Sequence, residues 1–222
     1  MTVKRATLFE LGRKPYADVL ALQRALHARV AAGECDDTWI LVEHEPVITL
    51  GRNAKREHVL AGAAALAARG IEVFEVERGG DVTYHGPGQV VVYPISRLER
   101  FREVVPLVNA LEDAALACCA RFGVAAERWS EHRGIYVGTG QIAAVGLAVK
   151  RMTSLHGIAL NAGTELDYAT LISPCGLTGR GVTSLSRETG RAVSFGEAAE
   201  VLLEELSVRF GVRFEREVAA PA

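Results

Sequence analysis

The sequence predicts one domain of the α/β (α+β) class. Segments with apolar residues at helical spacing alternate with short β-branched segments along the chain, and the connections between them are short. The chain has 222 residues, 49% of them hydrophobic, which is enough to bury a sizeable core without a second domain. We therefore expect residues 1–217 to form one enzyme-sized domain, followed by a loose tail over 218–222.

The first half of the chain predicts two helices and four strands. Apolar side chains recur at helical spacing over 16–32 and stop at Gly33, a common helix terminator. An alanine-rich stretch at 61–69 predicts a second helix that ends at Gly70. β-branched and apolar runs predict strands at 39–42, 47–50, 71–76 and 90–95.

The second half predicts two longer helices and three strands. Helical periods over 104–122 and 195–210 each end at a glycine, Gly123 and Gly211. Strands are expected at 134–137, 141–149 and 155–160. The last two can form a hairpin through residues 150–154.

Charge and cysteine content exclude several classes of protein. A formal net charge of −2 without a basic run argues against nucleic acid as a partner. No 18-residue apolar run occurs, and the first sixteen residues do not resemble a signal peptide, so we expect a soluble protein with no membrane partner. The four cysteines form no CxxC pair and no secreted spacing, which favours reduced thiols in a cytoplasm and no metal site.

Two glycine-rich segments, far apart in the sequence, are the main functional signals. The first, RGGDVTYHGPGQVVVYPI at 78–95, would let backbone approach a ligand where side chains would block it. The second, SPCGLTGRGVTSL at 173–185, holds Cys175 in a turn, where an exposed thiol with a fixed direction suits a nucleophile. A cysteine taken alone is more often a buried packing residue, so the interpretation of Cys175 as a nucleophile rests on its position in this turn.

Six ordered motifs make the chain similar to a known family. They lie at 41–52, 78–95, 132–138 (HRGIYVG), 142–149 (IAAVGLAV), 155–161 (LHGIALN) and 174–185. The chain resembles the lipoyl(octanoyl) transferases, the lipoate-protein ligase B family. The resemblance implies a mixed sheet flanked by helices, similar to the catalytic domains of biotin and lipoate protein ligases.

The resemblance also implies an activity. Such an enzyme moves an octanoyl group from octanoyl-acyl carrier protein, through a cysteine thioester, to a lysine of a lipoyl domain, and it needs no cofactor. The acceptors would be the lipoyl domains of 2-oxoacid dehydrogenases and the glycine cleavage H protein. Because acyl carrier protein is acidic, we expect a local basic patch, with Arg52, Lys55 and Arg56 as candidates.

Site residues follow from the resemblance by position. The catalytic positions are Cys175 and Gln141. Substrate binding falls on small or glycine-rich backbone and its neighbours: Arg78, Gly79, Gly80, Asp81, Val82, Thr83, Tyr84, His85, Ala144, Val145, Gly146, Gly157, Ile158 and Ala159. These residues leave room for an apolar tunnel of eight carbons and for an oxyanion hole of backbone N–H groups.

Gln141 departs from the family pattern, which has a lysine immediately before the IAA sequence. A glutamine can donate a hydrogen bond to a thiolate, but it cannot lower the thiol pKa by charge or take a proton from an amine. Three interpretations stay open: Gln141 suffices by hydrogen bonding while His85 or His156 acts as the general base, Lys150 substitutes from nine residues further along the strand, or the chain is a weakened or engineered variant.

Other functions compete with octanoyl transfer. An ATP-dependent lipoate or biotin ligase on the same scaffold would need no cysteine, but such ligases use a lysine near position 141. A non-catalytic module that binds carrier proteins or lipoyl domains is compatible with the missing lysine, yet it gives no reason for a thiol in a tight turn. A thioesterase that hydrolyses its acyl-enzyme is the fourth alternative.

Overall fold

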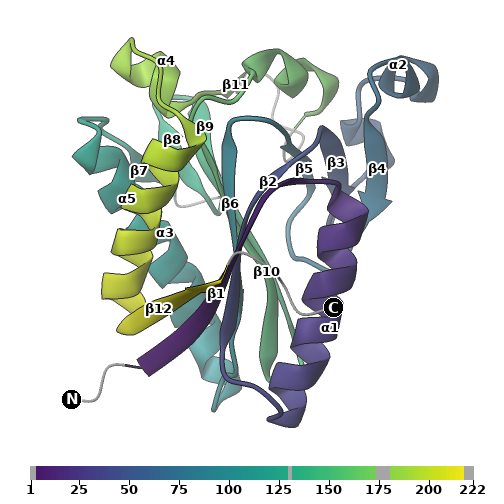
Figure 1. The fold of residues 1–222 in the computed structure, drawn as a ribbon. Helices are drawn as coiled ribbons and strands as arrows, with labels where there is room; N and C mark the ends of the chain where they lie inside the picture. Colours follow the sequence, from purple (N-terminus) through teal and green to yellow (C-terminus); the bar gives the residue numbers. More distant parts are fainter. Residues whose placement is uncertain (1–3, 130–131, 174–180, 218–222) are drawn as a thin grey trace.

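A computed structural model describes residues 4–129, 132–173 and 181–217, and a mixed β-sheet runs through its centre (Figure 1). The sheet consists of β1 (Lys4–Lys14), β2 (Thr38–His44), β6 (Gln89–Ile95), β7 (Glu127–Arg128), β8 (Ile135–Val137), β9 (Gly140–Lys150), β10 (Thr153–Asn161), β11 (Gly181–Val182) and β12 (Val212–Glu217). Its order is β12-β1-β2-β6-β10-β9-β8-β7, with β11 paired to β9. Strand β1 runs parallel to β12 and β2, whereas β2, β6, β10, β9, β8 and β7 pair antiparallel in succession.

A second, three-stranded sheet packs near the N-terminal end of the first helix. It has the order β4-β3-β5 and consists of β3 (Val47–Leu50), β4 (Glu72–Glu75) and β5 (Val82–His85). A buried cluster of Tyr16, Leu20, Val47 and Val76 joins that helix to the small sheet. Burial of these apolar side chains holds the small sheet beside the large one.

Helices cover both faces of the large sheet (Figure 1). Helix α1 (Tyr16–Ala32) lies on one face, and α3 (Val104–Arg121) and α5 (Phe195–Phe210) lie together on the other. The shorter helical segments are η1 (Arg56–His58), α2 (Ala63–Ala68), η2 (Phe101–Glu103), η3 (Leu166–Leu171) and α4 (Leu185–Thr189). No helix in the described part of the chain is both long and apolar enough to span a membrane.

Alternation of side chains along β2 and β6 builds two cores. Trp39 and Leu41 pack with α3 and α5, whereas Ile40 and Val42 pack with α1. Both faces of these strands are therefore buried, which explains why their sequences are continuous apolar runs and not alternating ones.

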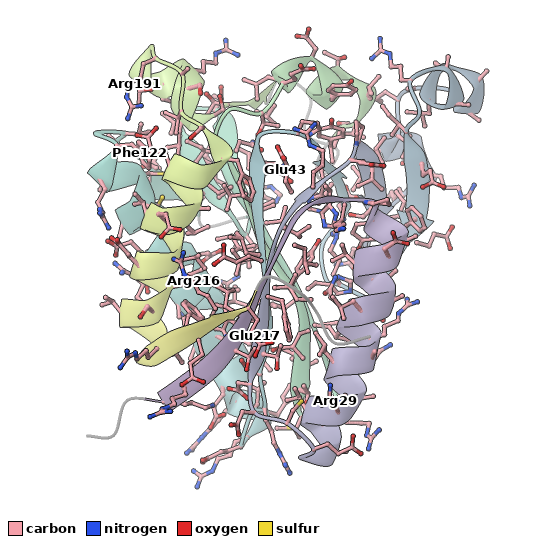
Figure 2. All side chains as sticks on the ribbon, viewed as in Figure 1. Arg29, Glu43, Phe122, Arg191, Arg216 and Glu217 are labelled. Atoms are coloured by element: carbon pink, nitrogen blue, oxygen red, sulfur yellow. The ribbon has the colours of Figure 1, made fainter. Side chains whose placement is uncertain are left out.

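Contacts of two arginines, Arg216 and Arg191, connect elements at the surface of the molecule (Figure 2). Arg216 Nη2 on β12 lies 2.6 Å from Glu200 Oε2 on α5. The guanidinium of Arg191 stacks over the ring of Phe122, 5.7 Å from its centroid. Such exposed contacts orient the elements but stabilise the fold less than the buried clusters do.

Most predicted elements are confirmed. The helix at 16–32 has the predicted bounds, and Gly33 ends it in the left-handed conformation with φ 76°. The hairpin of β9 and β10 is also confirmed, and Arg151 and Met152 form its turn with φ values of 49° and 56°. The sequence did not predict β1, β5, β7, β11, β12 or α4. Residues 218–222, expected as a tail, lie outside the described residues.

Candidate active site

Three adjoining cavities lie between the two sheets, and Thr83 and Ala144 line all of them. We call them the inner pocket, which includes Tyr16 and His156; the side pocket, which includes Tyr84 and Asn161; and the outer cavity, which includes His58 and Gln141. The outer cavity has the largest volume of the three, about 1350 Å³ including its mouth. The inner and side pockets are smaller, about 360 and 470 Å³ including the space at their openings.

The structure brings most of the predicted binding residues together at the inner pocket. Its lining includes Arg78, Thr83, His85, Ala144, Val145, Gly146, Gly157, Ile158 and Ala159. Of the remaining predicted residues, Tyr84 lines the side pocket, Val82 lines the side pocket and the outer cavity, and Gly80 and Asp81 line the outer cavity. Gly79 supports the wall, because its N–H donates to the Leu147 carbonyl at 2.8 Å.

Arg78 anchors the glycine-rich segment from inside. Its side chain is 6% exposed and donates to Thr49 O at 2.8 Å, to Thr49 Oγ1 at 2.8 Å and to Gly79 O at 3.0 Å. Gly146 on β9 allows this placement, since a Cβ there would lie 3.1 Å from Arg78 Cδ. Arg78 is therefore fixed within the fold and is not part of an exposed surface for a partner.

The segment expected to be a glycine-rich loop is partly a strand, which corrects the sequence interpretation. Residues Val82–His85 form β5 and pair antiparallel with β3. The following turn is tied to β2 through Glu43, whose Oε1 accepts from Gly88 N at 2.6 Å. Glu43 lies toward the upper end of the central strands (Figure 2). The motifs at 41–52 and 78–95 are thus one structural unit.

Buried histidines line or adjoin the inner pocket. Burial lowers the pKa of His85 to about 3 and the pKa values of His44 and His156 to about 4. His85 Nδ1 shares a 2.7 Å hydrogen bond with Gln89 Oε1, and His156 Nε2 lies 3.7 Å from Glu77 Oε2. Imidazoles with such low pKa values are weak bases, which argues against His85 or His156 as the general base.

Gln141 stands at the start of β9, in the wall between the side pocket and the outer cavity. Its Nε2 donates to Tyr136 Oη at 3.1 Å, and the Tyr136 ring stacks on Trp129 with centroids 4.2 Å apart. Gly134 makes room for this amide, since a Cβ there would lie 2.8 Å from Gln141 Nε2. The side-chain amide is therefore held in a defined position.

Lys150 cannot substitute for the family lysine. It lies at the other end of β9, nine residues away, which is about 30 Å in an extended strand. Its Nζ lies 3.4 Å from Glu77 Oε1. The interpretation that Lys150 replaces the lysine is wrong.

Cys175 lies outside the described residues, but the chain on both sides of it is anchored at the outer cavity. Before it, Ser173 N donates to His58 O at 2.7 Å. After it, β11 pairs with β9 so that Val182 is opposite Gln141, and Thr183 N donates to Gln141 O at 3.0 Å. Two cavity-lining residues, His58 and Gln141, thus hold the two ends of the segment that contains Cys175.

The sequence interpretation missed two features of this region. His58 Nδ1 and Asp81 Oδ2, 23 residues apart in the sequence, share a hydrogen bond of 2.5 Å at the outer cavity. Asn161, at the end of β10, donates to Thr183 O at 3.0 Å and accepts from Gln89 Nε2 at 2.9 Å. A polar residue that ends an apolar strand could have indicated Asn161, whereas no local pattern pairs His58 with Asp81.

The predicted basic patch is partly neutralised by neighbouring carboxylates. Arg56 Nη2 lies 2.9 Å from Glu75 Oε1, and Lys55 Nζ lies 3.9 Å from Glu57 Oε1. Arg52 is exposed. A partner that used this patch would have to compete with these two glutamates.

The fold agrees with the comparisons to known proteins. Residues 15–207 match the family model described as the lipoyl protein ligase A/B catalytic domain, and the chain belongs to this family. A relative from Syntrophobacter fumaroxidans named octanoyltransferase is 44% identical over 218 residues, which is 97% of this chain and 93% of the relative.

A second relative is longer than this chain. The octanoyltransferase from Myxococcus xanthus is 42% identical over 211 residues, which cover 92% of this chain but only 59% of the relative. Among solved structures, lipoate-protein ligase A bound with ATP superposes with a TM-score of 0.81 at 16% identity, over 99% of this chain and 90% of that chain. The mixed sheet with flanking helices is therefore confirmed as the fold of lipoate ligase catalytic domains.

Proposed function

We propose that this chain is an octanoyltransferase that uses Cys175 as its nucleophile. Its donor is octanoyl-acyl carrier protein, and its acceptor is a lysine of the lipoyl domains of 2-oxoacid dehydrogenases or of the glycine cleavage H protein. The acyltransferase class agrees with the names of the relatives and with the family. We further propose that residues 1–217 act as one catalytic domain in the cytoplasm, without nucleic acid or membrane as a partner.

One observation carries the proposal. The chain is anchored on both sides of Cys175, by His58 O before it and by Gln141 after it, at the cavity that adjoins the inner pocket. The other cysteines are poor candidates, because Cys118 and Cys119 are buried in α3, where burial raises the pKa of both thiols. Cys35 lies elsewhere, next to the C-terminal end of α1.

The reaction divides into two steps of different driving force. In the first, the Cys175 thiolate attacks the thioester of the donor, which exchanges one thioester for another at little cost. In the second, the lysine amine attacks the enzyme thioester, and formation of the more stable amide drives the transfer. The inner pocket, lined by Ala144, Gly157 and Ile158, would hold the acyl chain during both steps.

Gln141 acts in this scheme as a neutral hydrogen-bond donor. One amide N–H is used by Tyr136, and an amide has a second N–H that can face a thiolate or an oxyanion. Loss of the family's positive charge leaves the thiol less ionised, so acylation should be slower than with a lysine at this position.

Intact mass spectrometry after incubation with octanoyl-acyl carrier protein tests the proposal. We expect one octanoyl adduct in the parent and none in Cys175→Ser, and the adduct should move to an added lipoyl domain without ATP. Gln141→Lys should form the adduct faster, at constant yield. No adduct in either the parent or Gln141→Lys would reject the covalent mechanism, and transfer that required ATP would favour the ligase.

A further inference from the structure

The second step of the proposed function needs a base that the structure has not yet supplied. A lysine side chain is an ammonium at neutral pH, so it must lose a proton before its nitrogen can attack a thioester. Gln141 cannot accept that proton, Lys150 is about 30 Å away along β9, and His85 and His156 are buried weak bases.

A histidine–carboxylate pair lines the outer cavity together with residues of β9. His58 Nδ1 lies 2.5 Å from Asp81 Oδ2, and the two side chains are 16% and 8% exposed. Both residues line the cavity that also contains Gln141. Within the described parts of the chain, His58 Nε2 has no hydrogen-bond partner. It is also not among the buried polar atoms that lack a partner, so it is accessible from the cavity. That nitrogen is thus available to a ligand.

The backbone holds this pair in place. Three hydrogen bonds join the segment before His58 to the segment that carries Asp81: Gly51 N to Asp81 O, Arg52 N to Arg78 O and Asn53 N to Gly80 O, at 3.0–3.2 Å. Gly51 permits this approach, because a Cβ there would lie 2.4 Å from Gly80 O. Asp81 Oδ1 also accepts from Lys55 N at 3.4 Å. The backbone that carries the His58 and Asp81 side chains is therefore held by hydrogen bonds.

The same segment is connected to the chain that leads to the proposed nucleophile. His58 O accepts from Ser173 N, and the neighbouring residues Val59 and Ile172 form an antiparallel bridge. The backbone of His58 is therefore hydrogen-bonded to Ser173, the last described residue before the segment that contains Cys175. A group that takes a proton from an attacking nucleophile must be close to the scissile bond, and this backbone connection and the place of His58 in the lining of the outer cavity support that role.

From this geometry we infer that His58 is the general base of the transfer step and that Asp81 is its positioning residue. This inference rests on the proposed function. His58 Nε2 takes one proton from the ammonium of the acceptor lysine, and the freed amine attacks the carbonyl carbon of the acyl thioester. The C–S bond breaks as the C–N bond forms, and the sulfur leaves as a thiolate.

The protons balance in the same site. Attack by the amine leaves a second excess proton on nitrogen, which passes to the departing thiolate, and His58 releases the first proton to solvent. Asp81 fixes the ring so that Nδ1 donates to the carboxylate and Nε2 accepts, and it stabilises the imidazolium that forms. The overall change is thioester plus ammonium to amide, thiol and one proton.

Single-turnover transfer from the preformed acyl-enzyme tests the inference with two nucleophiles. One is a lipoyl domain, whose lysine needs a base, and the other is hydroxylamine, whose nitrogen is largely unprotonated at neutral pH. We expect the acyl-enzyme of His58→Gln to transfer to the lipoyl domain about 100-fold or more slowly than the parent and to react with hydroxylamine within about twofold of the parent. Asp81→Asn should show the same pattern with a smaller loss.

Several outcomes would overturn the inference. Unchanged transfer to the lipoyl domain in His58→Gln would do so, as would equal slowing with both nucleophiles, which indicates a structural effect. His132 lines the same cavity, so the selective loss in His132→Gln instead of His58→Gln would assign the base to His132. Added imidazole should restore transfer in His58→Ala. Absence of an acyl adduct in the parent would reject the proposed function itself, and this result is distinct from all the others.

Discussion

Gly157 shows how closely two strands approach at the inner pocket. A Cβ at this position would lie 2.1 Å from Val92 O and 2.7 Å from Pro94 Cδ on β6. The neighbouring residue, His156, has a φ of 61°, and its N–H donates to Gln23 Oε1 at 3.1 Å. The glycine is required here by space and not by its conformational freedom.

Gly157→Ala should therefore lower the free energy of unfolding by about 3 kcal/mol or more, because the clash is with backbone that cannot move without disturbing the sheet. Gly196→Ala is the matched control, since a Cβ at Gly196 in α5 meets nothing within 4 Å. That change should leave stability equal or raise it by about 0.5–1 kcal/mol. Urea denaturation measures both, and equal stability of the two variants would contradict the prediction.

Residue-level chemistry separates what the sequence could and could not predict of the site. The small residues of the β9 and β10 motifs were predictable, because apolar strands with glycine or alanine at set positions indicate close approach. The pairing of His58 with Asp81 was not, because it depends on how the segment at 51–55 folds onto 78–81. Side chains brought together by tertiary contacts leave no periodic trace in the sequence.

At the scale of elements, α3 is linked to β8 by one buried carboxylate. Glu112 is 1% exposed, and its Oε1 accepts from Gly134 N at 3.0 Å. Its Oε2 lies 3.0 Å from Arg128 Nε and 3.2 Å from Arg133 Nη1. This carboxylate ties the helix to the strand that carries Tyr136, the partner of Gln141.

Glu112→Ala should lower the free energy of unfolding by about 3 kcal/mol, because it leaves the buried Gly134 N–H without its acceptor and removes one carboxylate partner from each of two arginines. Glu200→Ala provides a surface comparison, since it removes the ion pair with Arg216 and should cost less than about 1 kcal/mol. Thermal and urea unfolding of both variants would show the difference. Similar losses in the two variants would mean that burial does not determine how much these contacts contribute to the free energy of unfolding.

Elements with long apolar patterns were predictable, and those without were not. Helix α1 and the β9–β10 hairpin have strong periodicity and clear end signals. Strand β1 mixes basic and apolar residues over eleven positions, and β12 has the charged sequence VRFERE. Both are strands because each pairs in parallel with a neighbour from a distant part of the chain, which overrides weak local preference.

At the scale of the whole molecule, buried neutral histidines make the fold sensitive to acid. Burial is the main cause of the lowered pKa values of His44, His85 and His156, about 4, 3 and 4. In the unfolded chain these imidazoles titrate near 6.5, so unfolding takes up protons between about pH 6.5 and the lower folded values. Above about pH 6.5 these imidazoles do not make the free energy of unfolding depend on pH. Between about pH 6.5 and the lower folded pKa values, they lower it as the pH falls.

The free energy of unfolding should accordingly fall as the pH drops below about 6.5, by up to about 1.4 kcal/mol per pH unit for each imidazole. His44→Gln removes one of the three titrating groups, so the variant should lose less stability than the parent between pH 7.5 and 5, even if it starts lower. Urea midpoints at the two pH values provide the comparison. Equal losses in both proteins would exclude His44 as a contributor.

The parallel pairing of β1 with β12 has a consequence for biosynthesis. Lys4 and Val212 are register partners, so β1 cannot pair with β12 until residues 212–217 have left the ribosome. At about 5–20 residues per second, the intervening 208 positions take roughly 10–40 s to translate. Through that time the nascent chain carries an open strand edge, which is the kind of surface that chaperones shield from other chains.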